Sequence, residues 1–139
     1  MRHRAVIFED DSLIRFTLWK LFDDRGYEVF TFPDPGMCPL QVLRECPCPA
    51  NTSCSDLIIS DVNMAGTNGI DFIEGLIQKG CRQRHFALMS GNFSEVDLTR
   101  ASQIGCTLFS KPLAMVALQA WIEETERSIP PDRKLFDWT

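Results

Sequence analysis

Leu57-Ile58-Ile59-Ser60-Asp61-Val62-Asn63-Met64-Ala65-Gly66-Thr67-Asn68-Gly69 is the most informative stretch of this 139-residue chain. An apolar run rich in β-branched residues ends at Asp61, a polar turn with two glycines follows, and apolar residues then recur at helical spacing from Ile70 to Ile77. This pattern predicts a buried parallel strand, a loop and an amphipathic helix over residues 69–78. Ligands in open α/β sheets bind just beyond the carboxyl ends of the strands, so we expect chemistry at Asp61, although an aspartate that only caps a turn is the alternative.

The composition limits the classes of protein to which the chain can belong. Hydrophobic residues make up 45% of the 139 residues, which indicates one globular domain. No apolar run approaches the length of a membrane span, and residues 5–8 are too short for the apolar part of a signal peptide, so we expect a cytoplasmic protein with no membrane contact. The net charge is −5 and no basic block occurs, which argues against direct contact with nucleic acid.

Strands and helices are predicted to alternate along the chain. The expected strands cover residues 5–8, 27–32, 57–61, 85–90 and 107–110. The expected helices cover residues 13–24, about 37–45, 69–78, from Ser94 to near Gly105, and about 113–127. This alternation predicts an α/β fold, a doubly wound parallel sheet with helices on both faces. We expect residues 1–128 to form this single domain and residues 129–139 to form a C-terminal tail.

Polar residues and glycines mark several predicted helix ends. Ser12 is a candidate N-cap of the first helix, and Gly26 is placed to end that helix in a left-handed conformation. Ser94, with Asp97 three residues later, forms a weak version of the capping box.

Five polar residues fall at the ends of predicted strands. Glu9 and Asp10 follow the first strand, Asp61 ends the third, Ser90 ends the fourth and Lys111 follows the fifth. In a doubly wound sheet all five lie on one edge. Three carboxylates there repel one another unless a cation lies among them, and carboxylates with a backbone carbonyl suit Mg²⁺. An aspartate can also act as a nucleophile and form an aspartyl phosphate, with an ammonium and a hydroxyl to neutralise and position the phosphoryl group.

These motifs resemble those of the response-regulator receiver domains of bacterial two-component signalling. The matching motifs are Glu9-Asp10, Asp61-Val62-Asn63-Met64 with Gly66 and Gly69, Ser90-Gly91 and Lys111-Pro112. The resemblance covers about residues 4–126 and implies a flavodoxin-like five-stranded sheet in the order 2-1-3-4-5.

The resemblance also implies a phosphoacceptor function rather than that of an enzyme. Asp61 would accept a phosphoryl group from a histidine kinase or a phosphotransfer protein. Glu9, Asp10, Asp61 and the carbonyl of Asn63 would hold Mg²⁺, for which Mn²⁺ could substitute.

The same resemblance assigns the remaining site residues. Lys111 would pair with the phosphoryl oxygens, and the peptide bond before Pro112 would be cis. Ser90 would hydrogen-bond the phosphate and shift its loop, which is the switch.

The last predicted helix suggests a contact surface. Residues 113–122 are apolar around most of the helix circumference, so some, such as Met115 and Ala117, are expected to point outward. In the resembling family, the face made by helix four, strand five and helix five is the usual output and dimer surface. We therefore expect a downstream protein or a second copy of the chain to bind there.

The sequence departs from the family pattern at three places. Ala65 stands where the family usually has proline. Leu108, three residues before Lys111, stands where the family usually has the tyrosine or phenylalanine that rotates on activation. Either that aromatic switch is absent or the neighbouring Phe109 takes part. The loop over residues 46–55 is also longer than the family needs.

Four of the six cysteines are close together in the sequence. They follow the pattern C-x7-C-x-C-x5-C and are Cys38, Cys46, Cys48 and Cys54. A tetrahedral thiolate site suits zinc, but C-x-C with a proline between is not the usual zinc knuckle. A structural metal and free thiols in a stiff proline-rich loop therefore both remain open.

Three other functions compete with the receiver. A phosphatase of the haloacid-dehalogenase type needs a second aspartate two residues after the nucleophile, where this chain has Asn63. A flavin-binding module needs a phosphate loop after the first strand, where this chain has acids that would repel phosphate. A degenerate receiver that serves only as a docking module conflicts with the presence of all the acids, Ser90 and Lys111. The sequence does not distinguish a stand-alone receiver from one excised from a larger regulator.

Overall fold

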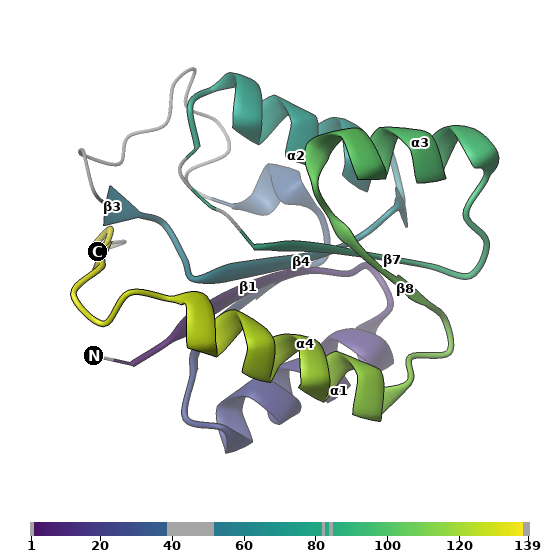
Figure 1. The fold of residues 1–139 in the computed structure, drawn as a ribbon. Helices are drawn as coiled ribbons and strands as arrows, with labels where there is room; N and C mark the ends of the chain where they lie inside the picture. The colour runs from purple at the N-terminus through teal and green to yellow at the C-terminus, as the bar shows by residue number, and fades with distance from the viewer. Residues whose placement is uncertain (1, 39–51, 82, 84, 138–139) are drawn as a thin grey trace.

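A five-stranded parallel sheet forms the centre of the computed structural model, which describes residues 2–38, 52–81, 83 and 85–137. Its order is β2-β1-β4-β7-β8, which in chain order of these strands is the predicted 2-1-3-4-5 (Figure 1). The strands are β1 Arg4–Phe8, β2 Glu28–Phe32, β4 Leu57–Asp61, β7 Phe86–Ser90 and β8 Thr107–Ser110. The predicted flavodoxin-like α/β fold is therefore confirmed.

Helices cover both faces of the sheet (Figure 1). One layer contains α1 Ser12–Asp24 and α4 Met115–Ser128, and the other contains α2 Gly69–Gln78 and α3 Glu95–Ile104. Because side chains alternate along a strand, Ala5 and Ile7 join the core on the α1–α4 side, whereas Val6 and Phe8 join the core on the α2–α3 side. The two cores bury the central strands on both faces, as a parallel sheet requires.

Two small strand pairs and one short helical turn complete the described elements. β5 Asn63–Met64 and β6 Thr67–Asn68 form an antiparallel hairpin, and β3 Thr52–Ser53 pairs in parallel with β9 Lys134–Leu135. A 3₁₀ turn, η1, covers Pro35–Met37. Of the helix predicted over residues 37–45, only residues 37 and 38 are described; residues 39–45, like most of the long loop after them, lie outside the described residues.

The ends of the helices agree with most of the predicted caps. Ser94 and Asp97 form the complete capping box, and Gly26 has the left-handed φ of 83°. The N-cap predicted at Ser12 is wrong, because the side chain of Asp11 accepts the amides of Leu13 and Ile14 at 2.9 and 3.0 Å. Ser12 is instead the first residue of α1.

The predicted exposure of α4 is correct for only part of the helix. Ala117 is exposed, and its neighbour Val116 is 82% exposed. The expectation that Met115 points outward is wrong, because its side chain is half-buried against the core between the sheet and α1–α4. Leu118 and Ile122 bury the inner face of the helix, and Met115 lies close to that face.

Residues 129–137, predicted as part of a tail, pack against the amino end of the sheet. β9 pairs with β3, and Phe136 N donates to Ser53 O at 2.8 Å. The domain boundary at residue 128 stays a prediction. None of the helices in the described part of the chain is long and apolar enough to cross a membrane.

The first residue of α2 approaches the backbone of β4 very closely. A Cβ atom on Gly69 would lie 2.0 Å from the carbonyl oxygen of Asp61, and Gly69 N donates to Val62 O at 2.8 Å. Only a residue without a side chain lets the helix begin this close to the strand.

The replacement Gly69→Ala is expected to lower the free energy of unfolding by about 2 kcal/mol or more, because the new methyl group clashes with backbone that cannot move aside cheaply. Gly75→Ala is the control, since a Cβ atom added there would have open space for 4 Å around it. There alanine should raise stability by about 0.5–1 kcal/mol through helix propensity. Urea unfolding of both variants checks this, and equal effects of the two replacements would contradict it.

Candidate functional site

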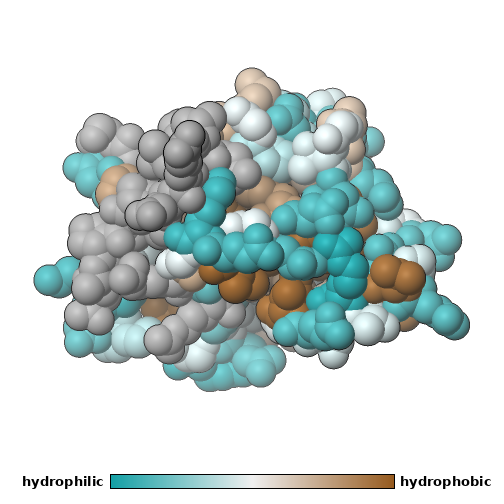
Figure 2. Space-filling model, turned by 90° about the horizontal axis from the view of Figure 1, so that it is seen from above, coloured by the Kyte–Doolittle hydropathy of each residue, from teal (hydrophilic) through white to brown (hydrophobic). Residues whose placement is uncertain are grey.

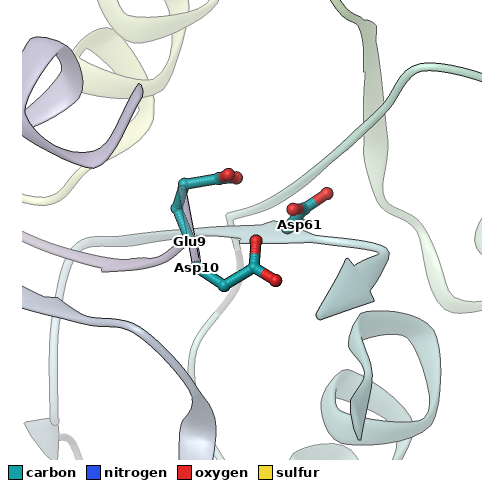
Figure 3. A group of neighbouring side chains, drawn as sticks. All are labelled: Glu9, Asp10 and Asp61. Carbon is teal, nitrogen blue, oxygen red and sulfur yellow. The ribbon is translucent and has the colours of Figure 1, made fainter. Parts of the chain in front are cut away.

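Three carboxylates converge where two neighbouring strands end. Glu9 and Asp10 follow β1, and Asp61 is the last residue of β4, which pairs with β1 up to Phe8 and Ser60. Figure 3 shows the three side chains facing a common space. One ligand oxygen from each lies within 4.8 Å of the others. Parallel pairing of the two strands is therefore what brings these acids together.

The acids differ in their exposure to solvent. Glu9 is fully buried and Asp61 is 4% exposed, whereas Asp10 is exposed. Burying two carboxylates at one strand edge is costly unless a positive charge is near them.

Lys111 supplies that positive charge from the end of β8. Its Nζ donates to Asp61 Oδ2 at 3.0 Å and to the two carboxylate oxygens of Glu9 at 3.2 and 3.1 Å. Its backbone N donates to Ser90 O at 2.8 Å, and the peptide bond to Pro112 is cis, as the resemblance implies. The ammonium thus bridges two of the three acids.

Burial and hydrogen bonding shift the pKa values of Glu9 and Lys111. Burial raises the pKa of Glu9 from 4.5 to about 7; the hydrogen bond from Lys111 opposes this rise, and the charge of Asp61 adds to it. Burial alone would lower the pKa of Lys111, but its hydrogen bonds to Asp61 and Glu9 outweigh that effect and raise it. The site therefore stabilises a positive charge, whereas burial opposes the ionisation of Glu9.

The hydroxyl of Ser90 lies beside the acids in a small hydrogen-bond ring. Ser90 Oγ donates to Asn92 O at 3.0 Å and accepts from Asn92 N at 3.1 Å, and Asn63 Nδ2 donates to it at 3.4 Å. Ser90 is 1% exposed. Its hydroxyl is thus held by the loop after β7.

Arg15 is a site residue that the sequence analysis missed. From α1, its Nη1 donates to the carbonyl of Glu9 at 2.8 Å and to that of Asp10 at 3.4 Å. The Asp10 carboxylate in turn accepts the amide of Ala65 at 3.3 Å. Arg15 therefore fixes the peptide that presents the acid pair. Its place in the first turns of the helix after that pair was the signal available in the sequence.

Leu108 and Phe109 point to opposite faces of the sheet. Leu108 packs against the core on the α2–α3 side, whereas Phe109 is buried on the α1–α4 side. The Phe109 ring meets Trp121 edge-on, with 5.8 Å between ring centroids. Because a shift of one residue along a strand reverses the face, Phe109 does not take the place of an aromatic residue at Leu108.

The predicted cysteine cluster is described only in part. Cys38 is buried and Cys54 is half-buried. Cys46 and Cys48 lie outside the described residues, so the four-cysteine metal site stays a prediction. Within the described ranges, the group of side chains suited to a metal ion is Glu9, Asp10 and Asp61.

The acid cluster has a donor set that fits a magnesium ion. Mg²⁺ binds oxygens at roughly 2.0–2.1 Å, so two opposite ligands lie about 4.2 Å apart. The 4.8 Å limit on the spacing of the three carboxylate oxygens is close to that value. Small movements would bring the three carboxylates within reach of one ion, and Asn63, the first residue of β5, follows Asp61 by two residues.

Comparisons with known proteins agree on one family. The family model described as the response regulator receiver domain matches residues 5–123. A probable transcriptional regulatory protein of Picosynechococcus sp. is 29% identical over 118 residues, which are 84% of this chain and 46% of the relative. The chain thus spans about half the length of that relative.

Solved structures share the fold at low sequence identity. The non-phosphorylated HemR receiver domain of Leptospira biflexa has a TM-score of 0.76 and 19% identity, covering 94% of this chain and 98% of that one. Chemotaxis protein CheY4 of Vibrio cholerae has a TM-score of 0.71 and 22% identity, covering 90% and 99%. A two-component response regulator of Clostridium difficile has a TM-score of 0.74 and 14% identity, covering 91% and 98%.

The raised pKa of Glu9 predicts how stability depends on pH without metal. The folded state holds the Glu9 proton up to about pH 7, whereas the group in the unfolded chain loses it near 4.5. The stability that this proton contributes is therefore present below about 4.5 and is lost as the pH rises through about 7.

The replacement Glu9→Gln removes this ionisation, so the fall in the free energy of unfolding across that pH range should be smaller than in the wild type. Urea unfolding in chelator-treated buffer measures it, with the exposed Glu123→Gln as the control. A Glu9→Gln profile parallel to the wild-type profile would contradict the assignment.

Proposed function

This chain belongs to the family of response regulator receiver domains of two-component signalling, and from that premise we propose that it takes a phosphoryl group onto Asp61. The donor is a histidine kinase or a phosphotransfer protein, and the reaction depends on Mg²⁺ or Mn²⁺. The observation that carries the proposal is the convergence of Glu9, Asp10 and Asp61 beside Lys111. We place the protein in the cytoplasm, where such donors act.

The acid cluster gives each residue a separate task. Glu9, Asp10, Asp61 and the carbonyl of Asn63 hold the divalent ion, which when bound neutralises charge on the acids and on the phosphoryl oxygens. Arg15 keeps the acid pair in place through its backbone carbonyls. A bound divalent ion would neutralise part of the negative charge of the acids. The Lys111 ammonium would then be released to pair with the incoming phosphoryl group.

The transfer is a substitution at phosphorus. A carboxylate oxygen of Asp61 forms the new P–O bond while the P–N bond to the donor histidine breaks, and the imidazole keeps the electron pair and is protonated. Lys111 Nζ, which lies 3.0 Å from Asp61 Oδ2 in the unphosphorylated structure, then pairs with a phosphoryl oxygen. The Ser90 hydroxyl gives up its 3.0 Å hydrogen bond to Asn92 O and donates to another phosphoryl oxygen. This exchange of partners shifts the loop of Ser90.

The lifetime of the phosphoryl group depends on how well the site activates water. Asn63 and Asn92 flank the site, and neither side chain is a carboxylate or a strong base, so neither activates water well. We propose an intermediate lifetime, which Asn92→Glu or Asn92→Lys would change. Dephosphorylation rates that are indistinguishable between these variants and the wild type would contradict this role.

The signal leaves the domain through the face formed by α3, β8 and α4. This face corresponds to helix four, strand five and helix five of the family, and it binds a downstream protein or a second copy of the chain. α3 exposes Val96 and Leu98 by 66% and 45%, and α4 exposes Val116 by 82%. Figure 2, which is seen from above and therefore shows the side of α2 and α3 rather than that of α4, has apolar side chains interrupted by polar ones. The exposed apolar side chains of α3 and α4 suit a contact that the loop of Ser90 can strengthen.

Intact mass after incubation with a small phosphodonor tests the acceptor. The wild type with Mg²⁺ should gain one phosphoryl group, and Asp61→Asn should gain none because the nucleophile is gone. Asp10→Ala should lose metal binding, since it removes a hard oxygen ligand. Asp24→Asn, at an exposed aspartate of α1, is the control and should behave as wild type. A phosphorylated Asp61→Asn protein would overturn the proposal.

Sedimentation with and without beryllofluoride tests the contact surface. If a second copy binds there, the phosphoryl mimic should favour a dimer, and Val116→Glu or Ala117→Glu should weaken it by placing a charge on an apolar contact. Thr17→Glu, at an exposed position of α1, is the matched control. A protein that stays monomeric in both states at high concentration excludes the homodimer and leaves the downstream protein as the partner.

A further inference from the structure

Residues 129–137 cross the amino end of the sheet as a segment that we call the strap. It begins where α4 ends, passes the amino ends of β1 and β4, and forms β9 beside β3 (Figure 1). The strap lies beyond residues 5–123, which are the part matched by the family model. The strap itself therefore lies outside the matched region, although it contacts residues within that region.

A partly buried ion pair ties the strap to the central strands. Arg133 binds Asp56 with two hydrogen bonds, from Nε to Oδ1 at 2.8 Å and from Nη2 to Oδ2 at 2.7 Å. Asp56 is 5% exposed and directly precedes β4. It also exchanges two hydrogen bonds with Arg4 of β1, because Arg4 N donates to Asp56 Oδ2 and Asp56 N donates to Arg4 O, both at 2.9 Å. One carboxylate thus joins the strap, β1 and β4.

A second set of polar contacts holds the end of the strap. Arg4 Nη1 donates to Phe136 O at 2.6 Å and to Cys54 O at 3.0 Å. Phe136 N donates to Ser53 O at 2.8 Å. None of the described strap residues belongs to the two core clusters, and a cavity of about 790 Å³ lies between the strap and residues such as Gln83. Polar contacts, rather than packing in the core, therefore hold the strap.

The two ends of α4 differ in how firmly they are held. At the carboxyl end, Glu126 accepts Arg25 Nη2 at 2.8 Å and Tyr27 Oη at 2.9 Å, and the Ser128 hydroxyl lies 3.3 Å from His85 Nε2. The strap continues from this end. At the amino end, the N-cap residue Ala114 makes no side-chain cap hydrogen bond. The carboxyl end is anchored, whereas the end next to Lys111 lacks a capping side chain.

We propose that the strap is a latch that fixes the carboxyl end of α4 to the amino ends of β1 and β4 through Arg133 and Asp56. When the loop of Lys111 moves, α4 therefore pivots about its carboxyl end, and the displacement is confined to its amino end. The strands held by the latch are the two whose opposite ends carry Glu9, Asp10 and Asp61. The anchor stands on the observed contacts alone, whereas the pivot rests on the proposed phosphorylation of Asp61.

The latch depends on the ion pair between Arg133 and Asp56. Without the guanidinium, the Asp56 carboxylate stays buried with the backbone amide of Arg4 as a partner but without its ion pair, which is an unfavourable state. The chain relieves it by lifting the strap and admitting water. Local opening of this kind accelerates hydrogen exchange of the amides that the strap protects.

Hydrogen exchange of the full chain in metal-free buffer tests the anchor. Arg133→Gln is expected to speed exchange at the Phe136 and Arg4 amides and in residues 125–128 by about tenfold or more. Lys134→Gln removes the same charge from the next residue, whose side chain is exposed, and should stay within about twofold of wild type. Equal exchange in the two variants would overturn the anchor. Faster exchange in the strap with residues 125–128 unchanged would also overturn it.

Adding Mg²⁺ and beryllofluoride to the same proteins tests the pivot. In the wild type, exchange should change in the first turn of α4 and stay constant in residues 125–128, and in Arg133→Gln both ends should respond. Equal responses at both ends of wild-type α4 would overturn the pivot. If beryllofluoride leaves the loops around Asp61 unchanged, the proposed phosphorylation and the pivot both fail. The anchor is still judged by the first experiment, in which no phosphoryl mimic is present.

Discussion

The hydrogen bonds from Lys111 to Glu9 and Asp61 are the interactions on which the rest of the site depends. Parallel pairing of β1 and β4 places acids at adjacent strand ends, and burial makes their joint ionisation costly. β8, at the edge of the sheet, delivers an ammonium to the same place. The three acids outnumber the one ammonium, so the cluster keeps negative charge that can attract a divalent ion.

Contacts elsewhere in the chain hold the edge of the sheet that carries the acids in place. Arg15 binds the backbone that presents the acid pair, and the close approach of Gly69 to the carbonyl of Asp61 keeps the loop between β4 and α2 compact. At the other end of the same strands, Asp56 joins β1, β4 and the strap. The acids are therefore held by strands that are tied at both ends, while the amino end of α4, beside Lys111, lacks a capping side chain.

The sequence predicts the features that depend on neighbours along the chain or on strand periodicity. The alternation of strands and helices and the meeting of the acids at one edge follow from apolar runs that end in polar residues. The Ser94 capping box follows from the local spacing of Ser94 and Asp97, whereas the strand order follows from the resemblance to the receiver family. The sequence does not distinguish Asp11 from Ser12 as an N-cap, because either side chain can accept the same amides. The pairing of Arg133 with Asp56 joins residues 77 positions apart, and nothing local marks either as a partner. Long-range polar contacts of this kind appear only when the fold brings distant parts of the chain together.

The affinity for Mg²⁺ in wild type and in Lys111→Met, measured by calorimetry at a pH above the raised pKa of Glu9, tests the central claim most directly. If the ammonium and the metal serve the same acids, removing the ammonium strengthens metal binding several-fold, by about 1 kcal/mol or more, because one positive charge no longer competes. Unchanged or weaker binding in Lys111→Met would show that the acid cluster is not a shared cation site.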